Sequence, residues 1–314
     1  MSAPPIIEVR DLSKRFGSFQ AVNKVSFHVE RGEIFGYLGA NGAGKSTTIR
    51  MLTGLLAPSS GSATVAGADI ASEPTRVKRA IGYMSQRFSL YLDLSVEENL
   101  RFFAGAYGLS GAHRERRVHA ALELAGLHDR RRVTTRDLPG GIRQRLALGS
   151  ALLHEPAIVF LDEPTAGVDP AARRGFWRVI RDLAAQGTTV FVTTHHLDEA
   201  EYCARVGLMV DGRLVALDTP QGLKTAHVPG SLYAVESPEG TRAAAALLTD
   251  APGVLAVEPF GQRLHVRVQG SADPLRFQNL LTSRGVLGAT FEPVEPTLED
   301  VFLALVGDAG KATP

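Results

Sequence analysis

The sequence predicts an α/β fold in which a mostly parallel sheet presents a phosphate-binding loop. Residues 39–46, GANGAGKS, fit the pattern G-x-x-x-x-G-K-[ST], whose glycines let backbone N–H groups surround phosphates. An apolar run at 34–38 leads into this loop, and a helical pattern from Ser46 to Leu56 follows it. A second apolar run ends in Asp162 and Glu163, as expected of a buried parallel strand that delivers two carboxylates to the same pocket.

The loop residues have distinct expected roles. Lys45 reaches the β- and γ-phosphates, and Ser46 contributes its hydroxyl to a Mg²⁺ ion. Asp162 is placed to hold the same ion, directly or through water. The alternative is an ordinary glycine turn before a helix, which would make both motifs coincidental. We therefore expect the nucleotide to be bound by Gly39, Asn41, Gly42, Ala43, Gly44, Lys45, Ser46 and Thr47.

Glu163 directly follows the carboxylate expected to hold Mg²⁺. A carboxylate in that position can accept a proton from an attacking water, which is the role of a general base. The alternative is a surface glutamate before the turn at Pro164. With the phosphate-binding loop in place, we favour the catalytic role.

The bulk composition is that of a folded protein with no strong charge. The 314 residues include 34 basic and 33 acidic side chains, a net charge of +1, so no overall field favours nucleic acid. The single cysteine, Cys203, rules out an internal disulfide and fits a reducing compartment. The N-terminus has no signal-peptide pattern, and no uncharged apolar run reaches the ~18 residues of a membrane-spanning helix. We therefore expect a cytoplasmic location.

The chain before about residue 222 reads as one domain with a helical insertion at about 88–155. Residues 95–155 lack strand signals and show helical spacing, whereas β-structure precedes the loop and α/β alternation returns after Asp162. Glycine and proline between 58 and 67 indicate a turn and a hairpin. The expected strands are 6–9, 21–29, 34–38, 188–193 and 205–210, and a helix is expected over 171–186.

Residues 230–308 have a separate pattern. Strand-like 231–236, helix-like 242–248, strands 254–259 and 263–268, helix-like 274–284 and strand-like 289–295 follow one another, before a last helix at 298–306. The order βαββαβ is that of a ferredoxin-like split βαβ unit. We therefore predict a small C-terminal α+β domain.

Between the two phosphate-site motifs lies Leu138-Pro139-Gly140-Gly141, which resembles the signature segment of ABC-transporter ATPases, usually Leu-Ser-Gly-Gly-Gln. Further family marks occur in order across residues 6–220, so the chain is identified as a member of this P-loop NTPase family, with ATP and Mg²⁺ as cofactors. The resemblance implies that Phe16 stacks on adenine and Gln86 senses Mg²⁺ and the membrane partner. It also implies that Asp169 forms the D-loop and that His195 contacts the γ-phosphate.

The family resemblance implies a mechanism and partners. Two ATPase domains sandwich two ATP molecules, each phosphate loop facing the partner's Leu138, Pro139, Gly140 and Gly141, and closure drives a membrane permease between conformations. We expect a dimer on the inner face of the cell membrane, with the permease docking near Arg87–Leu100. A homodimer is favoured, because no cis motif is lost, and pairing with a second ATPase subunit is the alternative. The apolar side chains of that segment alternatively cover the core of the insertion itself.

Pro139 departs from the family pattern. It stands where a serine hydroxyl would reach the γ-phosphate across the dimer, and proline supplies neither a hydroxyl nor an N–H. Proline nevertheless suits the first position of a helix, and Gly140 and Gly141 still present N–H groups at a positive helix end. We expect the contact across the dimer to be weakened but to survive.

Several alternatives stay open. The closing segment 292–302 resembles that of bacterial drug-, antibiotic- and polysaccharide-export ATPases, which favours efflux, but the substrate leaves no sequence signal. A ribosome- or DNA-directed ATPase and a regulatory module crippled by Pro139 are the alternative functions. Phe16 can instead be a core aromatic, and His196 is expected to be a packing or surface residue. Arginines at 114–117 and 130–132 lack interleaved aromatics, so we expect no nucleic-acid binding.

Overall fold

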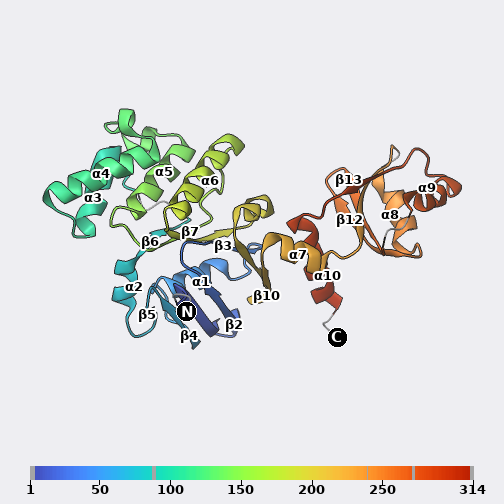
Figure 1. Cartoon of the computed structure of the whole chain (residues 1–314), viewed down its shortest axis with the longest axis horizontal. Coiled ribbons are helices and arrows are strands. Elements are labelled where there is room, and N and C mark those ends of the chain that lie inside the picture. The colour runs from blue at the N-terminus through green and yellow to red at the C-terminus, as the bar shows by residue number, and fades with distance from the viewer. Residues whose placement is uncertain (1–3, 87–89, 239, 271–272, 312–314) are drawn as a thin grey trace. The chain divides into compact units, whose positions relative to one another are not determined.

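The computed structural model describes residues 4–86, 90–238, 240–270 and 273–311, and the side chains up to residue 306 (Figure 1). The chain divides into two compact units that meet between Thr219 and Pro220, three residues before the predicted boundary at 222. Each unit has its own apolar core. Among the described residues, no helix has the length and apolar character needed to cross a membrane.

The first unit is built on a six-stranded sheet in the order β10-β9-β3-β8-β7-β6. Strands β6, β7, β8, β3 and β9 are parallel, and β10 joins the edge antiparallel to β9. Every residue of β3, β7 and β8 is buried, as expected where helices or a second sheet cover both faces. The bounds are β3 Ile34–Gly39, β6 Ile81–Met84, β7 Ile158–Asp162, β8 Thr189–Thr194, β9 Arg205–Val210 and β10 Arg213–Asp218.

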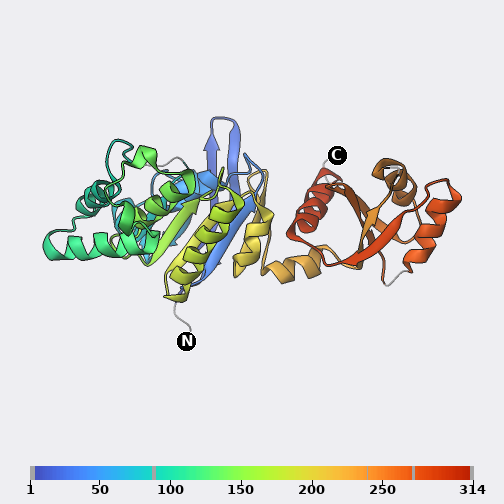
Figure 2. The same ribbon diagram turned by 90° about the horizontal axis from the view of Figure 1, so that it is seen from above.

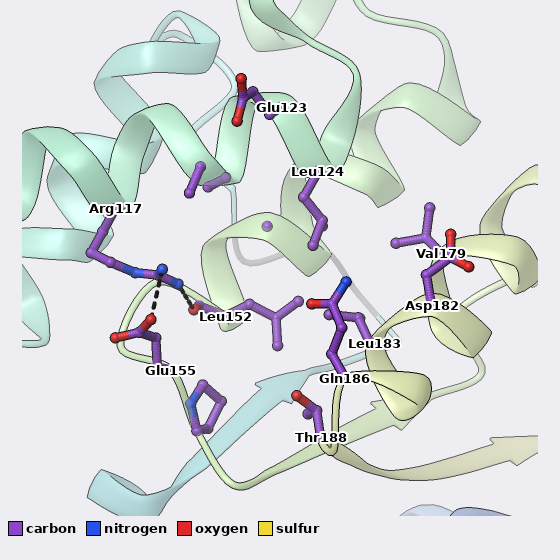
Figure 3. Close-up of a pocket in the computed structure, with 14 residues that line it drawn as sticks. Arg117, Glu123, Leu124, Leu152, Glu155, Val179, Asp182, Leu183, Gln186 and Thr188 are labelled. Carbon is purple, nitrogen blue, oxygen red and sulfur yellow. Dashed lines mark hydrogen bonds and ion pairs between the residues drawn. The ribbon is translucent and has the colours of Figure 1, made fainter. Parts of the chain in front are cut away.

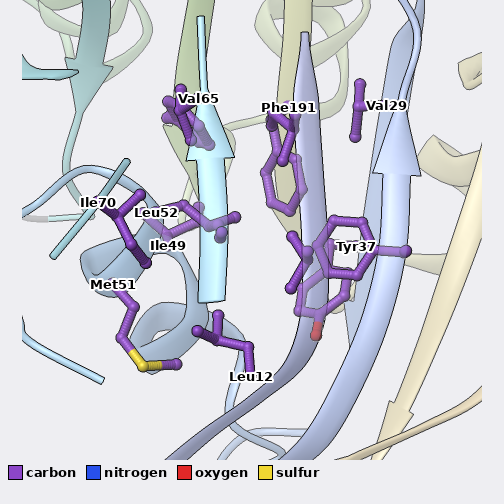
Figure 4. Packing of buried hydrophobic residues seen from close by; sticks show 14 of the residues in the cluster. Leu12, Val29, Tyr37, Ile49, Met51, Leu52, Val65, Ile70 and Phe191 are labelled. Atoms are coloured by element: carbon purple, nitrogen blue, oxygen red, sulfur yellow. The ribbon is translucent and has the colours of Figure 1, made fainter. Parts of the chain in front are cut away.

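A second, antiparallel sheet in the order β2-β1-β4-β5 packs over the parallel sheet. Its inner face shares one apolar cluster with helix α1 (Lys45–Leu52) and the parallel strands (Figure 4). Stacked and tilted rings of Phe27, Phe35, Tyr37 and Phe191 lie 5.4–6.2 Å apart within it. The bounds are β1 Ile7–Phe16, β2 Phe19–Val29, β4 Ser60–Val65 and β5 Ala68–Asp69.

The first strand is longer than the sequence pattern predicts. The expected strand 6–9 continues to Phe16, and three register shifts interrupt its pairing with β2. Asp11, with φ +46°, and Lys24, with φ +48°, mark these irregularities. Because each bulge shifts the side chains to the other face, the alternation that would reveal the strand is lost.

The insertion between β6 and β7 is helical, as predicted. Helices α3 (Val96–Ala106), α4 (Gly111–Ala125) and α5 (Gly140–Ala151) surround an apolar cluster that includes Leu100, Leu122 and Leu146. Two more helices belong to the core, α2 (Pro74–Ala80) before β6 and α6 (Pro170–Ala185) after β7. The insertion therefore stands as a separate layer with its own core.

The second unit has the predicted βαββαβ order. Its sheet runs β12-β13-β11-β14, all pairs antiparallel, so β13 separates the two strands that α8 connects. Figure 2 shows α8 and α9 on one face of this sheet and α10 on the other. On the α10 face, the Nδ1 atom of His265 lies 2.6 Å from Oδ1 of Asp300. The bounds are α7 Pro220–His227, β11 Ser231–Glu236, α8 Thr241–Thr249, β12 Val254–Phe260, β13 Arg263–Val268, α9 Pro274–Ser283, β14 Thr290–Val294 and α10 Leu298–Lys311.

Candidate nucleotide-binding site

The phosphate-binding loop connects β3 to α1 at the carboxyl edge of the parallel sheet. Gly42, at φ +86°, and Gly44, at φ +104°, adopt the left-handed conformation that favours glycine. A Cβ atom on Gly44 would lie 2.5 Å from the carbonyl oxygen of Ala21, so only glycine fits there. The loop therefore holds its backbone against β2 while the first amides of α1, which have no intrahelical acceptors, face the loop.

Lys45 is buried inside this loop. Its Nζ atom donates to the carbonyl oxygens of Gly39, at 2.8 Å, and Ala40, at 3.1 Å. The same ammonium lies 3.4 Å from Oε1 of Glu163, which comes from the end of β7. The positive charge is thus placed at the centre of the loop, where it would face a phosphate anion.

Asp162 and Ser46 lie together, as the sequence predicts. Ser46 Oγ donates to Asp162 Oδ1 at 3.1 Å, and Thr193 Oγ1 donates to the same oxygen at 2.7 Å. Burial raises the pKa of Asp162, and the hydrogen bonds from Thr193 and Ser46 oppose that shift. A carboxylate and a hydroxyl this close form the hard oxygen pair that suits Mg²⁺. The described residues contain no cluster of three His, Cys, Asp or Glu side chains that could hold a metal unaided, so phosphate and water oxygens would have to complete the shell.

Glu163 is the centre of a compact polar cluster. Gln86 Nε2 donates to its Oε2 atom at 3.0 Å, and His195 Nδ1 lies 3.4 Å from that same oxygen. The backbone of Glu163 has φ +49°, which is unusual for a residue with a side chain. Its N–H is held by Thr193, through the carbonyl oxygen at 3.1 Å and Oγ1 at 3.0 Å. The buried carboxylate is therefore fixed in place on both its backbone and its side chain.

Four segments that are distant in the sequence meet at this cluster. The loop supplies Lys45, the end of β6 supplies Gln86, the end of β7 supplies Glu163, and the end of β8 supplies His195. Because β3, β6, β7 and β8 are parallel members of one sheet, their carboxyl ends share one edge. The geometry thus brings the predicted catalytic residues Gln86, Glu163 and His195 together with Lys45, the residue predicted to bind phosphate.

Phe16 lies outside the core. It ends β1, pairs with Phe19 across the turn, and is 47% exposed, with Lys14 Nζ 5.3 Å from its ring centre. The alternative of a core aromatic is therefore wrong. An exposed ring beside a cation is available for stacking on a base, and that role stays a prediction.

The signature segment opens helix α5 in the insertion. Pro139, with φ −56° and ψ 151°, occupies the N-cap position, one residue before the first helical position expected for it, and Gly140 begins the helix. Leu138 is buried in the insertion core. Asp169 caps α6 by accepting from the amides of Ala171, at 3.0 Å, and Ala172, at 2.9 Å. The hydrogen bonds that surround Glu163 come from the core strands, so the structure leaves the signature and D-loop roles as predictions.

Thr193 was not singled out by the sequence. It is fully buried, bonds the Asp162 carboxylate and accepts from the Glu163 amide, and so joins the two acidic residues. From the sequence alone, a threonine in an apolar strand is simply a β-branched residue that favours strand structure. Only the pairing of β7 with β8, which sets Asp162 beside Thr193, gives its hydroxyl a role.

A cavity of about 570 Å³ lies elsewhere in the first unit, between α4, α5 and α6. Figure 3 shows Arg117 of α4 paired with Glu155 along its edge, and the two side chains are 2.9 Å apart. Pro156 and Thr188, which line it, precede β7 and β8. The cavity is therefore at the amino ends of the strands, whereas the predicted site residues lie at the carboxyl ends.

Comparison with known proteins agrees with the geometry. The ABC transporter family model matches residues 22–166. The Nod factor export ATP-binding protein I of Cupriavidus pinatubonensis is 38% identical over 303 residues, covering 96% of this chain and 91% of that protein. The probable multidrug ABC transporter ATP-binding protein YbhF of Escherichia coli K12 is 52% identical over 219 residues, which are 70% of this chain but only 38% of that protein.

Solved structures show the same fold. An ATP-binding subunit of an ABC transporter, 34% identical, superposes with a TM-score of 0.63 over 70% of this chain and 92% of its own length. A dimeric ATP-binding cassette in a post-hydrolysis state with ADP and Pi, 26% identical, gives a TM-score of 0.62 over 68% of this chain and 98% of its own.

The fold and the cluster around Glu163 define an ATP-binding cassette, a P-loop ATPase of the kind that serves transporters. The chain belongs to the ABC transporter family of ATP-binding proteins.

Proposed function

We propose that this protein hydrolyses ATP to power a membrane exporter, by closing as a dimer on separately encoded permease subunits. The observation that carries the proposal is the buried Glu163 carboxylate, in contact with Gln86, His195 and Lys45 beside the Asp162–Ser46 pair. A carboxylate fixed next to a phosphate-binding loop is suited to accept a proton from a water that attacks the γ-phosphate.

The residues of the cluster divide the chemistry among them. Lys45 would neutralise charge on the β- and γ-phosphates, and His195 would contact the γ-phosphate oxygen while it holds Glu163 in place. Ser46, Asp162 and the amide oxygen of Gln86 would hold Mg²⁺, which would offset the negative charge of the phosphates. Glu163 takes the proton of the attacking water, because its carboxylate is already oriented by its neighbours.

The export direction is supported by the relatives. The chain aligns along nearly the whole length of a Nod factor export protein, and a linearmycin resistance ATP-binding protein of Bacillus subtilis is 37% identical over 219 residues. The exported substrate of this chain would be chosen by its permease. The location that follows is the cytoplasmic face of the cell membrane.

The proposed permease contact lies near the start of the helical insertion. Tyr91, Leu92 and Phe102 are each between 45% and 48% exposed, and the rings of Tyr91 and Phe102 meet edge to face at 4.5 Å. Leu90, in contrast, is buried in the insertion core, as the alternative role of covering that core predicts for this residue. Arg87, Phe88 and Ser89, at the start of the predicted docking segment, lie outside the described residues.

A homodimer is the proposed assembly. The dimeric ATP-binding cassettes among the structural neighbours support pairing of two such domains. Each phosphate loop would then face the Pro139-Gly140-Gly141 helix start of the partner, whose amides would contact the γ-phosphate without a serine hydroxyl.

The test combines turnover with identification of partners. We expect Glu163→Gln to lower the ATP hydrolysis rate by about 10²–10⁴-fold while ATP binding persists, because the loop and Asp162 are unchanged. Tagged Glu163→Gln protein, purified from solubilised membranes with ATP, should then carry a multi-span membrane protein. The exposed Glu299→Gln serves as the matched control.

Two results would contradict the proposal. If the ATP hydrolysis rate did not depend on Glu163, this residue would not be the general base. Co-purification of ribosomal proteins or nucleic acid, with no membrane protein, would instead support the ATPase that acts on ribosomes or DNA.

A further inference from the structure

A fully buried carboxylate lies just behind the catalytic cluster. Glu199, in the short helix η3 (Leu197–Tyr202) after His195 and His196, is 0% exposed. Its Oε1 atom accepts from the hydroxyl of Thr165 at 2.5 Å and lies 3.4 Å from Nε of Arg173. Since a buried charge needs a partner, the Arg173 guanidinium is what makes ionised Glu199 tolerable there.

Arg173 also reaches the residue next to His195. Its terminal nitrogen lies 3.4 Å from Nε2 of His196 and another lies 3.7 Å from Oδ2 of Asp198. A guanidinium only donates, so His196 Nε2 must accept and the ring must be neutral. Burial first, and then the charges of Arg173 and His195, lower the pKa of His196, which agrees with that neutral form.

These contacts form a continuous chain of side-chain interactions that begins next to Glu163 and returns to it. Thr165 lies two residues after Glu163 and bonds Glu199, and Glu199 pairs with Arg173. Arg173 meets His196, and the next residue, His195, returns to Glu163 at 3.4 Å. The rings of His195 and His196 lie 4.2 Å apart. One arginine therefore touches both ends of the segment 196–199 that follows the catalytic histidine.

We propose that Arg173 is a positioning residue that holds the segment 195–199 so that His195 meets Glu163. The inference rests on the proposed ATPase function, because it concerns the geometry of that site. Arginine suits the task because its planar fork can face Glu199, Asp198 and His196 at once, which a lysine ammonium cannot do in the same way. His196 gains a role as the neutral acceptor that Arg173 requires.

The position of Arg173 also links this segment to helix α6. Asp169 caps the start of that helix, and the Arg173 amide donates to the Asp169 carbonyl oxygen at 2.9 Å, one turn into it. A displacement of the Asp169 segment would therefore move the guanidinium that holds His196. The D-loop predicted at Asp169 and the histidine predicted to contact the γ-phosphate are in this way joined through one side chain.

The test is a double-mutant cycle on ATP turnover in the 314-residue chain. We expect Arg173→Ala to lower kcat on the order of tenfold with little change in KM, because phosphate-binding residues are untouched. In a His195→Ala background the same change should have almost no further effect, since residues that act through one another are not additive. Arg173→Lys should recover part of the rate. Arg178→Gln, an exposed charge on the same helix, is the matched control.

A second readout does not depend on turnover. Amide hydrogen exchange of residues 195–202 should quicken in Arg173→Ala and stay unchanged in Arg178→Gln. The inference would be overturned if the kcat losses of Arg173→Ala and His195→Ala were additive. It would also be overturned if amide hydrogen exchange of residues 195–202 were the same in Arg173→Ala as in the unmodified protein. If the unmodified protein hydrolyses no ATP, the proposed function itself is wrong. If it hydrolyses ATP but the effects of the two substitutions add, only the role of Arg173 is wrong.

Discussion

At the scale of single residues, Thr193 connects the carboxyl group of Asp162, which is predicted to bind Mg²⁺, with Glu163, which is predicted to be the general base. It donates to Asp162 and accepts from the Glu163 amide, and it is fully buried between them. A hydroxyl in such a place stabilises the fold and the site by the same bonds.

We predict that Thr193→Val lowers both turnover and stability. Valine keeps the shape but leaves Asp162 without its shortest hydrogen bond, so the free energy of unfolding should fall by about 1–3 kcal/mol. Turnover should fall with it, whereas Thr193→Ser should recover most of both. Urea unfolding and steady-state ATP hydrolysis measure the two effects. Equal loss in the serine and valine variants would show that packing, and not the hydroxyl, matters.

A second residue-scale prediction concerns Asp162 and pH. Burial raises the pKa of Asp162 above the unfolded value of 3.8, so the folded protein binds this proton more tightly than the unfolded chain. Ionisation of Asp162 therefore costs stability as the pH rises through that range. Without nucleotide at pH 7, Asp162→Asn should unfold at equal or higher denaturant concentration than the unmodified protein.

The same variant should lose its response to ligand. Mg²⁺ with ATP at ~100 times its Kd stabilises a binding protein by about 2.7 kcal/mol, and this gain should largely vanish in Asp162→Asn. Asp129→Asn, at an exposed position, is the control. A nucleotide-free Asp162→Asn protein that is clearly less stable would contradict the assigned cost of the buried charge.

At the scale of elements, helices α3 and α4 of the insertion start differently. Ser95 caps α3 with a complete capping box, in which its hydroxyl accepts from the Glu98 amide and the Glu98 carboxylate accepts from the Ser95 amide at 2.8 Å. Ser110 stands at the same position of α4 but makes no capping bond through its side chain. The two serines thus form a natural matched pair.

We predict that Ser95→Ala destabilises the first unit by about 1 kcal/mol, the usual cost of losing a helix cap. Ser110→Ala should change stability by much less, because no side-chain bond is lost. Chemical unfolding of the two variants side by side measures the difference. Similar losses in both would indicate that the cap on α3 contributes little beyond the residue's intrinsic preference.

At the scale of the whole molecule, the chain combines two units with separate cores. Among the described residues, the apolar cluster that contains Phe35 and the one that contains Leu122 lie within the first unit, and the cluster that contains Val266 lies within the second. Units of this kind can unfold independently.

We predict two heat-absorption transitions in calorimetry of the intact chain. Mg²⁺ and ATP, added to the Glu163→Gln protein to prevent turnover, should raise only the transition of the first unit, because ligand binding stabilises only the unit that holds the site. Removal of residues 220–314 should leave that ligand-dependent transition in place. A single transition that shifts as a whole would mean that the units unfold together.

Much of this protein follows from the sequence alone. The loop around Lys45, the acidic end of β7 and the helical insertion have local patterns, since glycine positions and apolar periodicity express backbone geometry directly. The βαββαβ order of the second unit was likewise predicted from local sequence patterns. The sequence did not predict the full length of the bulged strand β1 or the edge strand β10. Register shifts and half-exposed faces disturb the alternation of apolar and polar residues that identifies a strand.

What only the tertiary structure decided are the contacts between side chains far apart in the chain. Thr193 beside Asp162 depends on β8 pairing with β7, and Arg173 beside Glu199 depends on how α6 packs against the segment after β8. The exposure of Phe16 and the lowered pKa of His196 also follow from packing. The residue type determines which interactions a side chain can make. Which residue it contacts depends on strand order and burial, and no local sequence pattern encodes these.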